Sequence, residues 1–246
     1  MPDQQVPFSM VAALIRLGHK YAVDDLVSSA LVRLASCFSP DFGTYCASIT
    51  AGGSKSMACT PKVAIAAVNL ARLLGDEACA ILPSALYTCC QLAPDTLTRG
   101  VANEDGETET LSVADVELCI DARARLAGLT LSSAIRRCQP NTKSRNGLGE
   151  RNEDEEQCVQ VFCSPYLVSA TNRILNRTLG LPTLCGALDS MEGFITDSVR
   201  GGLLCRHCAE RARAKDRRER LQVWQTLPAI LGLQMKSWGG SNEGKL

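Results

Sequence analysis

The sequence predicts a mostly α-helical protein. Apolar residues make up 46% of the chain and aromatic residues only 4%, so Leu, Ala, Val and Ile must form most of the core, and this mixture favours helices over strands. Apolar residues also recur at helical spacing in several segments. Prolines near the starts of these segments and glycines near their ends mark helix boundaries.

Two short helices joined by a tight turn are predicted first. Pro7 can begin a helix because its missing N–H is not needed there, and Gly18 allows the chain to leave that helix. Asp24 or Asp25 can cap the second helix. The apolar positions of the two helices are Phe8, Val11, Ala12 and Ile15, and then Leu26, Ala30, Leu31, Leu34 and Phe38.

The middle of the chain combines a loop, a small hairpin and a long helix. Residues 39–58 are rich in Ser, Thr and Gly and are expected to form a loop. Residues 101–111 contain an Asp-Gly turn and are expected to form a hairpin. Ser112, with Asp115 three residues later, resembles a capping box and begins a helix that we expect to reach Arg137.

Changes in composition divide the chain into two parts. Residues 1–138 are predicted to form a helical body, and residues 158–246 a smaller, cysteine-containing helical module. Residues 139–157 contain Pro, Asn and Gly and end in an acidic run, so they are predicted to be a linker. Within the second part, residues 180–202 are expected to be irregular.

Charge and cysteine content indicate which partners and which cellular compartment to expect. The formal net charge is zero, so overall charge favours neither nucleic acid nor an anionic membrane as a partner. The 13 cysteines are an odd number and are mostly scattered, and the polar start of the chain does not resemble a secretory signal. No apolar run approaches the roughly 18 residues of a membrane span. We therefore expect an intracellular protein of the cytoplasm or nucleus, whose thiols are reduced.

One cysteine pattern indicates a metal site. Cys205 and Cys208 form a C-x-x-C pair, which places two thiolates on one turn as a tetrahedral zinc site requires. Cys158 and Cys163, spaced C-x4-C, are the best candidates for the other half of the site. We therefore predict that a structural zinc ion on these four cysteines stabilises the second module.

Other interpretations of these residues stay open. Cys185 is a spare ligand, and His207 could replace one sulfur. The cysteines could instead be buried or free thiols, and redox use of the C-x-x-C pair lacks a surrounding βαβ pattern. His19 and His207 are the only histidines, which restricts Ser-His and Cys-His catalysis, so we expect no enzyme. A cysteine nucleophile is the enzymatic alternative.

Residues 209–227 are predicted to form a highly charged helix that ends at Pro228. Its arginines and Lys215 alternate with Glu210, Asp216 and Glu219. A basic helix beside a zinc site could bind nucleic acid. We favour the simpler interpretation, a solvated helix with internal ion pairs. Its anchors to the body are expected to be the apolar residues Trp224, Leu227, Ile230, Leu231 and Trp238.

The chain resembles a known family at its start. The run Ala12-Ala13-Leu14-Ile15-Arg16-Leu17-Gly18-His19-Lys20-Tyr21, followed by Asp24-Asp25-Leu26, resembles the last two helices of a BTB/POZ domain. Five later stretches resemble the C-terminal region of BTB/POZ-domain proteins expanded in mushroom-forming fungi. They are residues 66–73, 81–90, 111–119, 204–208 and 223–228. The strands and first helices of a BTB domain, which form most of its dimer interface, have no counterpart here.

The resemblance implies a helical bundle formed by the end of a BTB domain and its helical extension. It also implies protein–protein interaction, in the family sometimes as a substrate adaptor for cullin-type ubiquitin ligases. We therefore expect a non-enzymatic adaptor that binds another protein. We do not expect a membrane, a nucleic acid or a small-molecule substrate as its partner. The alternative is a nucleic-acid-binding regulator that uses the zinc-stapled basic helix.

Overall fold

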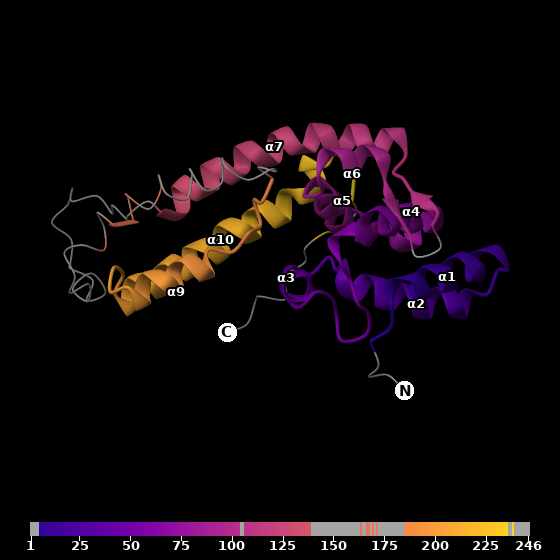
Figure 1. Ribbon diagram of the computed structural model, residues 1–246, viewed down its shortest axis with the longest axis horizontal. Helices are drawn as coiled ribbons and strands as arrows, with labels where there is room; N and C mark the ends of the chain where they lie inside the picture. Colours follow the sequence, from indigo (N-terminus) through magenta and orange to yellow (C-terminus); the bar gives the residue numbers. More distant parts are fainter. Residues whose placement is uncertain are drawn as a thin grey trace. The chain divides into compact units, whose positions relative to one another are not determined.

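The computed structural model describes residues 5–103, 106–138, 163, 166, 167, 169, 171, 185–235 and 238. This part of the chain is mostly helical and contains one two-stranded sheet, which confirms the predicted fold class (Figure 1). The chain divides into two compact units. Unit 1 comprises Met1–Arg125 and Trp224–Leu246, and unit 2 comprises Leu126–Val223. The expected linker lies outside the described residues, so the division at residues 138 and 158 stays a prediction.

Unit 1 contains most of the shorter helices and the sheet. Its elements are α1 (Phe8–Lys20), α2 (Asp24–Cys37), α3 (Phe42–Ala51), the 3-10 helix η1 (Pro61–Val63), α4 (Ala64–Leu74), the 3-10 helix η2 (Gly75–Ile81), α5 (Leu82–Cys90), α6 (Pro94–Arg99), β1 (Val101–Ala102) and β2 (Thr108–Glu109). The long helices α7 (Val113–Cys138) and α10 (Arg206–Ile230) each contribute residues to both units.

Helices α1 and α2 form the predicted hairpin and pack against each other. A Cβ atom on Gly18 would lie 2.7 Å from Cγ2 of Val27, so the absence of a side chain allows this close packing. Ala22 turns the chain with a φ of 53°, a left-handed conformation that non-glycine residues rarely adopt. Neither Asp24 nor Asp25 caps α2 as expected; both lie in its first turn, where a negative charge favours the helix dipole.

Helix α3 lies where a loop was expected, so the prediction for residues 39–58 is wrong over Phe42–Ala51. Asp41 caps the helix by accepting a hydrogen bond from the Thr44 amide at 2.8 Å. Tyr45 and Ser48 are buried, one helical turn apart. Burial of this face outweighs the weak helix propensity of a segment rich in Ser, Thr and Gly.

The predicted hairpin is confirmed, and Ser112 caps α7 as expected, although the Asp115 carboxylate binds the Ser112 hydroxyl rather than its backbone amide. Strands β1 and β2 pair antiparallel, and Val101 lies opposite Glu109. Ser112 accepts a hydrogen bond from the Asp115 amide at 3.1 Å, and its hydroxyl donates to the Asp115 carboxylate at 2.9 Å. Arg72 from α4 also binds this carboxylate, at 2.6 Å. The start of α7 is therefore capped and attached to α4.

Trp224 is the largest fully buried side chain of unit 1. Its ring lies against Phe42, Tyr45 and Trp238, with centroids 5.6, 4.8 and 4.9 Å away. Its indole N–H donates to the carbonyl of Pro40 at 3.0 Å. The sequence-based expectation that Trp224 anchors this helix is therefore confirmed within unit 1.

Helix α10 continues past Pro228 to Ile230, so the prediction that Pro228 ends it is wrong. A proline inside a helix leaves the carbonyl four residues earlier without its usual amide donor. Here that carbonyl belongs to Trp224, and it accepts a hydrogen bond from the Trp238 indole at 2.7 Å. The Trp238 side chain thus supplies the donor that Pro228 lacks.

Unit 2 contains the end of α7, the helix α9 (Glu192–Arg200) and most of α10. Residues 180–202 were expected to be irregular, but α9 occupies residues 192–200 and buries Ile195 and Ser198 on one face. In the described part of the chain, no helix is long and apolar enough to cross a membrane.

Candidate metal centre

Three cysteines of unit 2 form a compact cluster. The sulfur atoms of Cys163, Cys205 and Cys208 all lie within 4.8 Å of one another. Cys163 is buried and the other two are half-buried. Sulfur ligands of one tetrahedral zinc ion, each about 2.3 Å from the metal, lie ~3.8 Å apart, so small side-chain movements would suffice to close this cluster on a metal.

The local backbone of the C-x-x-C pair brings these sulfurs together. Cys205 directly precedes α10, and its sulfur accepts a hydrogen bond from the amide of Cys208 at 3.4 Å. The amide of Cys205 in turn donates to the sulfur of Cys163 at 3.3 Å. Amide donors and the start of a helix both stabilise a negatively charged sulfur. The arrangement therefore suits thiolates, the form in which cysteine binds metals.

Three of the four predicted ligands are thus brought together. The fourth, Cys158, lies outside the described residues. Cys185, named as a spare, is buried, and among the described residues it does not belong to this cluster. Cys138 packs nearby, but burial raises the pKa of its thiol and so favours the neutral form.

His207 adds a polar atom beside the cluster. Its Nε2 atom is buried and has no hydrogen-bond partner among the described residues. A buried polar atom without a partner is costly, so it indicates a missing neighbour. The sequence places His207 between two cluster cysteines, although its ring nitrogens do not belong to the group that lies within 4.8 Å. His207 is therefore a second candidate for the fourth ligand position.

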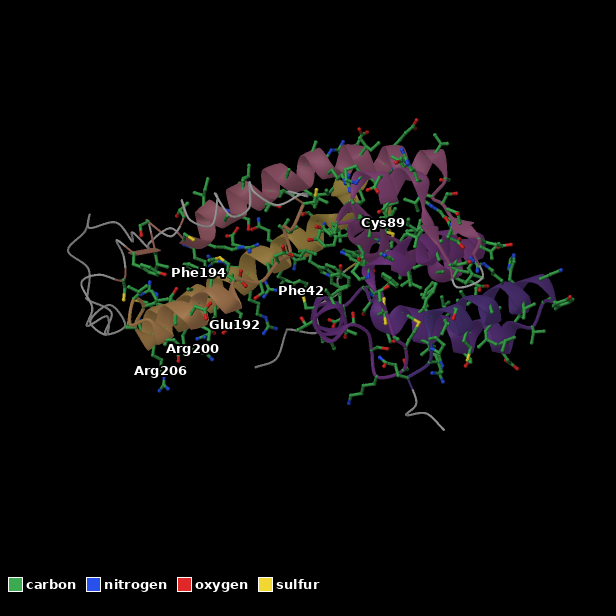
Figure 2. The ribbon with its side chains drawn as sticks, viewed as in Figure 1. Phe42, Cys89, Glu192, Phe194, Arg200 and Arg206 are labelled. Atoms are coloured by element: carbon green, nitrogen blue, oxygen red, sulfur yellow. The ribbon has the colours of Figure 1, made fainter. Side chains whose placement is uncertain are left out.

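An apolar shell surrounds the cysteines. Its buried members are Cys138, Met191, Ile195, Leu204, Ala209 and Ala212. Tyr166 and Phe194 pack against this shell as stacked rings, with centroids 6.2 Å apart, and the Tyr166 hydroxyl lies 2.8 Å from the hydroxyl oxygen of Ser198. Figure 2 labels Phe194 and Glu192 on α9 and Arg206 at the start of α10. A shell of this kind limits access of water to a metal.

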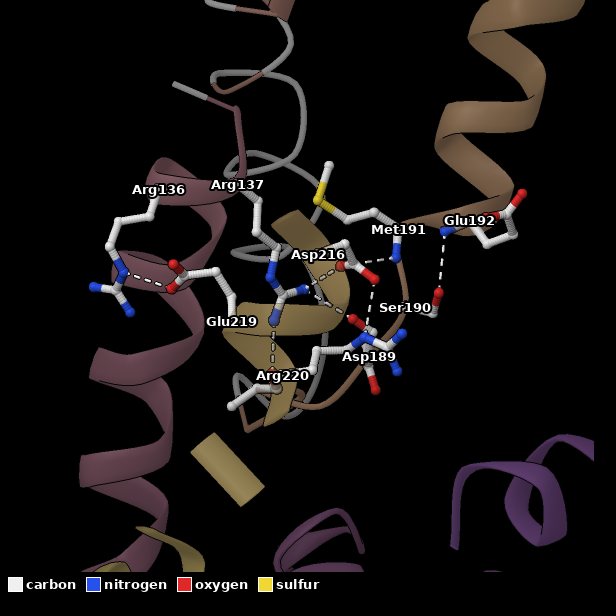
Figure 3. Close-up of polar contacts among 10 residues, drawn as sticks. Arg136, Arg137, Asp189, Ser190, Met191, Glu192, Asp216, Glu219 and Arg220 are labelled. Atoms are coloured by element: carbon white, nitrogen blue, oxygen red, sulfur yellow. Dashed lines mark hydrogen bonds and ion pairs between the residues drawn. The ribbon is translucent and has the colours of Figure 1, made fainter. Parts of the chain in front are cut away.

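A network of buried charges joins α7 to α10 inside unit 2 (Figure 3). Asp216 binds Arg137 at 3.2 Å and Arg220 at 2.9 Å, and the side chains of Arg137 and Asp216 are only 6% and 4% exposed. Arg136 binds Glu219 at 2.6 Å. Removing one partner from such a pair is strongly destabilising, since the other charge stays buried.

Arg137 also holds the segment before α9. Its guanidinium donates to the carbonyls of Ala187 and Asp189 at 2.8 and 2.9 Å. The amide of Met191 donates to Asp216 at 3.4 Å. Burial lowers the pKa of Arg137, and the negative charge of Asp216 opposes this shift. The network therefore orders the chain between residue 187 and α9.

This network changes the interpretation of the basic helix. The ion pair between Asp216 and Arg220 confirms that α10 has an internal salt bridge. However, Asp216 and Glu219 are buried and pair with arginines of α7 rather than lying on a solvated face. Sequence reasoning missed this pairing because the partners lie far apart in the chain. Four arginines of α10 are exposed, namely Arg206, Arg211, Arg217 and Arg218.

No family model, curated protein or solved structure matches this chain. The resemblance to BTB/POZ proteins therefore rests on the sequence motifs alone and stays an expectation.

Proposed function

We propose that this chain is a non-enzymatic, intracellular protein-interaction adaptor whose second unit is held together by a structural zinc ion. The zinc proposal rests on one observation, the convergence of the Cys163, Cys205 and Cys208 sulfurs within 4.8 Å. Zinc prefers such thiolate sets, and structural zinc sites usually complete four ligands from the protein. Cys158 is the proposed fourth ligand, and His207 is the alternative.

A zinc ion would have a structural role here. It would attach Cys163 to the start of α10. Without the metal, the hydrogen bond from the Cys205 amide to the Cys163 sulfur makes this connection. When bound, zinc neutralises the thiolate charges and supplies folding free energy. The reduced thiols that such a site needs fit an intracellular compartment.

Metal analysis of the purified protein tests the zinc proposal. We expect about one zinc ion per chain, and less than about half an equivalent would overturn the proposal. Cys205→Ser should lose the metal, whereas Cys79→Ser, which changes a half-buried cysteine outside the cluster, should keep it. Comparison of Cys158→Ser with His207→Ala then identifies the fourth ligand by loss of zinc.

The interaction proposal rests on the turn between α1 and α2. Leu17, Tyr21 and Val23 are 51%, 66% and 46% exposed although they are large and apolar, and they are clustered within seven residues of sequence. The ammonium group of Lys20 lies 5.5 Å from the centre of the Tyr21 ring. Exposed apolar side chains that cluster in this way favour a protein partner. Exposed charges of both signs, Lys20, Asp24 and Asp25, lie in the same stretch, so we propose a protein partner with an apolar surface and commit to no charge for its edge.

Site-specific photo-cross-linking tests this surface in the full chain. A cross-linking residue at position 21 should capture a defined protein from cells, and Leu17→Glu should abolish that capture while leaving the melting temperature unchanged. The matched control is a cross-linking residue at Val32, which is 71% exposed on α2 and lies outside the turn. Equal capture from positions 21 and 32, or none from either, would contradict the proposal.

The exposed face of α10 supports one second candidate, binding of nucleic acid. Burial of Asp216 and Glu219 leaves Arg211 and Arg218 among its exposed charges. Binding of a labelled duplex DNA or single-stranded RNA would weaken steeply with salt if this candidate held. Tight, salt-dependent binding that Arg211→Ala and Arg218→Ala reduce would favour this function over the adaptor.

A further inference from the structure

The two cysteines at the start of α10 are the part of the candidate zinc cluster that an oxidant can reach. Cys205 and Cys208 are half-buried, whereas Cys163 is buried among apolar side chains. The three sulfurs all lie within 4.8 Å of one another. A small oxidant that enters from solvent therefore meets two neighbouring thiols before it meets the third.

The backbone places these two thiols within reach of a disulfide bond. Cys205 directly precedes α10, and Cys208 is the third residue of that helix. Redox-active dithiols commonly have this C-x-x-C spacing. The two sulfurs, which lie within 4.8 Å of each other, have to approach to about 2.05 Å to form the bond. Rotation of the two side chains can supply this movement.

The local structure also favours the thiolate form of Cys205, which is the form that reacts with peroxide. Its sulfur accepts a hydrogen bond from the Cys208 amide at 3.4 Å, beside the first turn of the 25-residue helix α10. Amide donors and the positive end of a helix dipole stabilise a negatively charged sulfur. A thiol that ligates a metal is also deprotonated. Cys205 is therefore the expected nucleophile, and Cys208 is the thiol that resolves the first product.

We infer that hydrogen peroxide converts Cys205 and Cys208 into a disulfide and thereby releases the zinc ion, an inference that rests on the proposed zinc site. The Cys205 thiolate attacks one peroxide oxygen and becomes a sulfenic acid; the O–O bond breaks, and the other oxygen takes up a proton and leaves as water. The Cys208 thiolate then attacks the sulfenic sulfur. The S–S bond forms, the S–O bond breaks, and the hydroxide released takes up a second proton. Two thiolates are oxidised, and one peroxide is reduced to two waters.

The disulfide would remove two ligands from the metal at once. Cys163 and one further ligand would remain, whereas structural zinc sites use four ligands from the protein. After the metal has left, the hydrogen bond from the Cys205 amide still joins α10 to Cys163. Oxidation would therefore loosen the start of α10 from Cys163 within unit 2. The reaction alters the site and is not catalysis, so it does not need the βαβ surroundings of a thiol–disulfide oxidoreductase.

Zinc release and peptide mapping, both on the full-length protein, test the inference. Protein purified under reducing conditions is analysed for zinc, and hydrogen peroxide is then added in the presence of a coloured zinc indicator. We expect about one zinc ion to be released for each disulfide that forms. The remaining thiols are alkylated, and trypsin cleaves after Arg200, Arg206 and Arg211. The peptides of residues 201–206 and 207–211 should be joined, with the combined mass reduced by two hydrogens.

The outcomes separate this inference from the zinc proposal on which it rests. If the protein contains zinc, but peroxide fails to release the metal or fails to join these two peptides, the inference is overturned and the zinc site stands. Protein without zinc before peroxide is added overturns the zinc site, and the inference with it. A cross-link from residues 201–206 to residues 152–173, the tryptic peptide that contains Cys163, would show that the wrong pair of thiols was assigned.

Two variants complete the experiment. Cys208→Ser should not form the cross-link, and peroxide should leave a Cys205 sulfenic acid that dimedone labels. Cys79→Ser changes a half-buried cysteine outside the cluster, so it is the matched control and should keep both the zinc release and the cross-link. Loss of the cross-link in Cys79→Ser would contradict the inference. The mapping of the wild-type protein decides even where Cys208→Ser fails to fold.

Discussion

The two units are built around different cores. Unit 1 buries large apolar side chains, among them Ile15, Leu34, Phe38 and Trp224. The apolar cluster of unit 2 consists of thiols, alanines and a few larger side chains, and beside it lie the buried charges of Arg137, Asp216 and Glu219. The hydrophobic effect is proportional to the apolar area removed from water, so the smaller side chains of the described unit 2 cluster contribute less per residue. Among the described residues, unit 2 therefore depends more on specific polar contacts, to which the proposed zinc ion would add.

This difference predicts different responses to damage. An apolar core loses stability in proportion to the atoms removed and to the cavity that remains. A core with ion pairs and a metal loses stability abruptly, because each missing partner leaves a charge without compensation. Four measurements test this contrast between the units.

Removal of the proposed zinc ion should have the largest effect, and this effect should be confined to unit 2. Structural zinc sites in small domains contribute ~10 kcal/mol or more of binding free energy that is also folding free energy. After chelation, hydrogen exchange should become fast in α9 and the first half of α10, while α1 and α2 stay protected. Equal loss of protection in both units would contradict the contrast.

Asp216→Ala should cost about 3–5 kcal/mol, because it leaves the buried guanidinium of Arg137 without its carboxylate. Chemical denaturation followed by hydrogen exchange within unit 2 measures this loss. The double variant Asp216→Ala with Arg137→Met should recover part of the stability, since it removes the unpaired charge. A single variant as stable as the wild type would show that the network contributes nothing.

Leu34→Ala should cost ~3 kcal/mol in unit 1, since Leu34 is fully buried between packed helices. The exchange protection of α1 and α2 should fall while that of α9 is retained. Val32→Ala, at an exposed position of the same helix, is the control and should change little. If Leu34→Ala instead reduced the exchange protection of α9 first, the contrast between the two units would be contradicted.

Arg213→Ala should have the smallest effect. Arg213 pairs with Glu192 at 2.8 Å, but both side chains are substantially exposed and the pair is screened by solvent. We expect no measurable change in the melting temperature at physiological salt. A clear decrease would mean that the polar contacts of unit 2 act as one network that extends to its surface.

Local patterns in the sequence predicted the elements that local interactions determine. The α1–α2 hairpin, the β1–β2 pair and the capping of α7 by Ser112 depend on residues close in sequence, and the structure confirms them. The C-x-x-C spacing of Cys205 and Cys208 is a local signal, whereas Cys163 lies 42 residues before Cys205 and was paired with them only by analogy with two-part zinc sites; the structure places the three sulfurs within 4.8 Å of one another. In α3, the cap at Asp41 was a detectable signal, but the composition of the segment concealed it.

The elements that the sequence did not predict depend on distant partners. The buried position of Asp216 requires Arg137, which lies on another helix, and no spacing rule relates the two. Helix α9 forms where its buried face meets the apolar cluster around Ile195.

The hydrogen bond between the Trp238 indole and the Trp224 carbonyl predicts which residues related sequences can have at two positions. The carbonyl is available only because residue 228 is a proline; any other residue would supply a helical amide that competes for it. Positions 228 and 238 should therefore vary together among relatives. A relative that has lost the proline should tolerate many side chains at position 238, whereas one that retains it should keep a side chain that donates a hydrogen bond there.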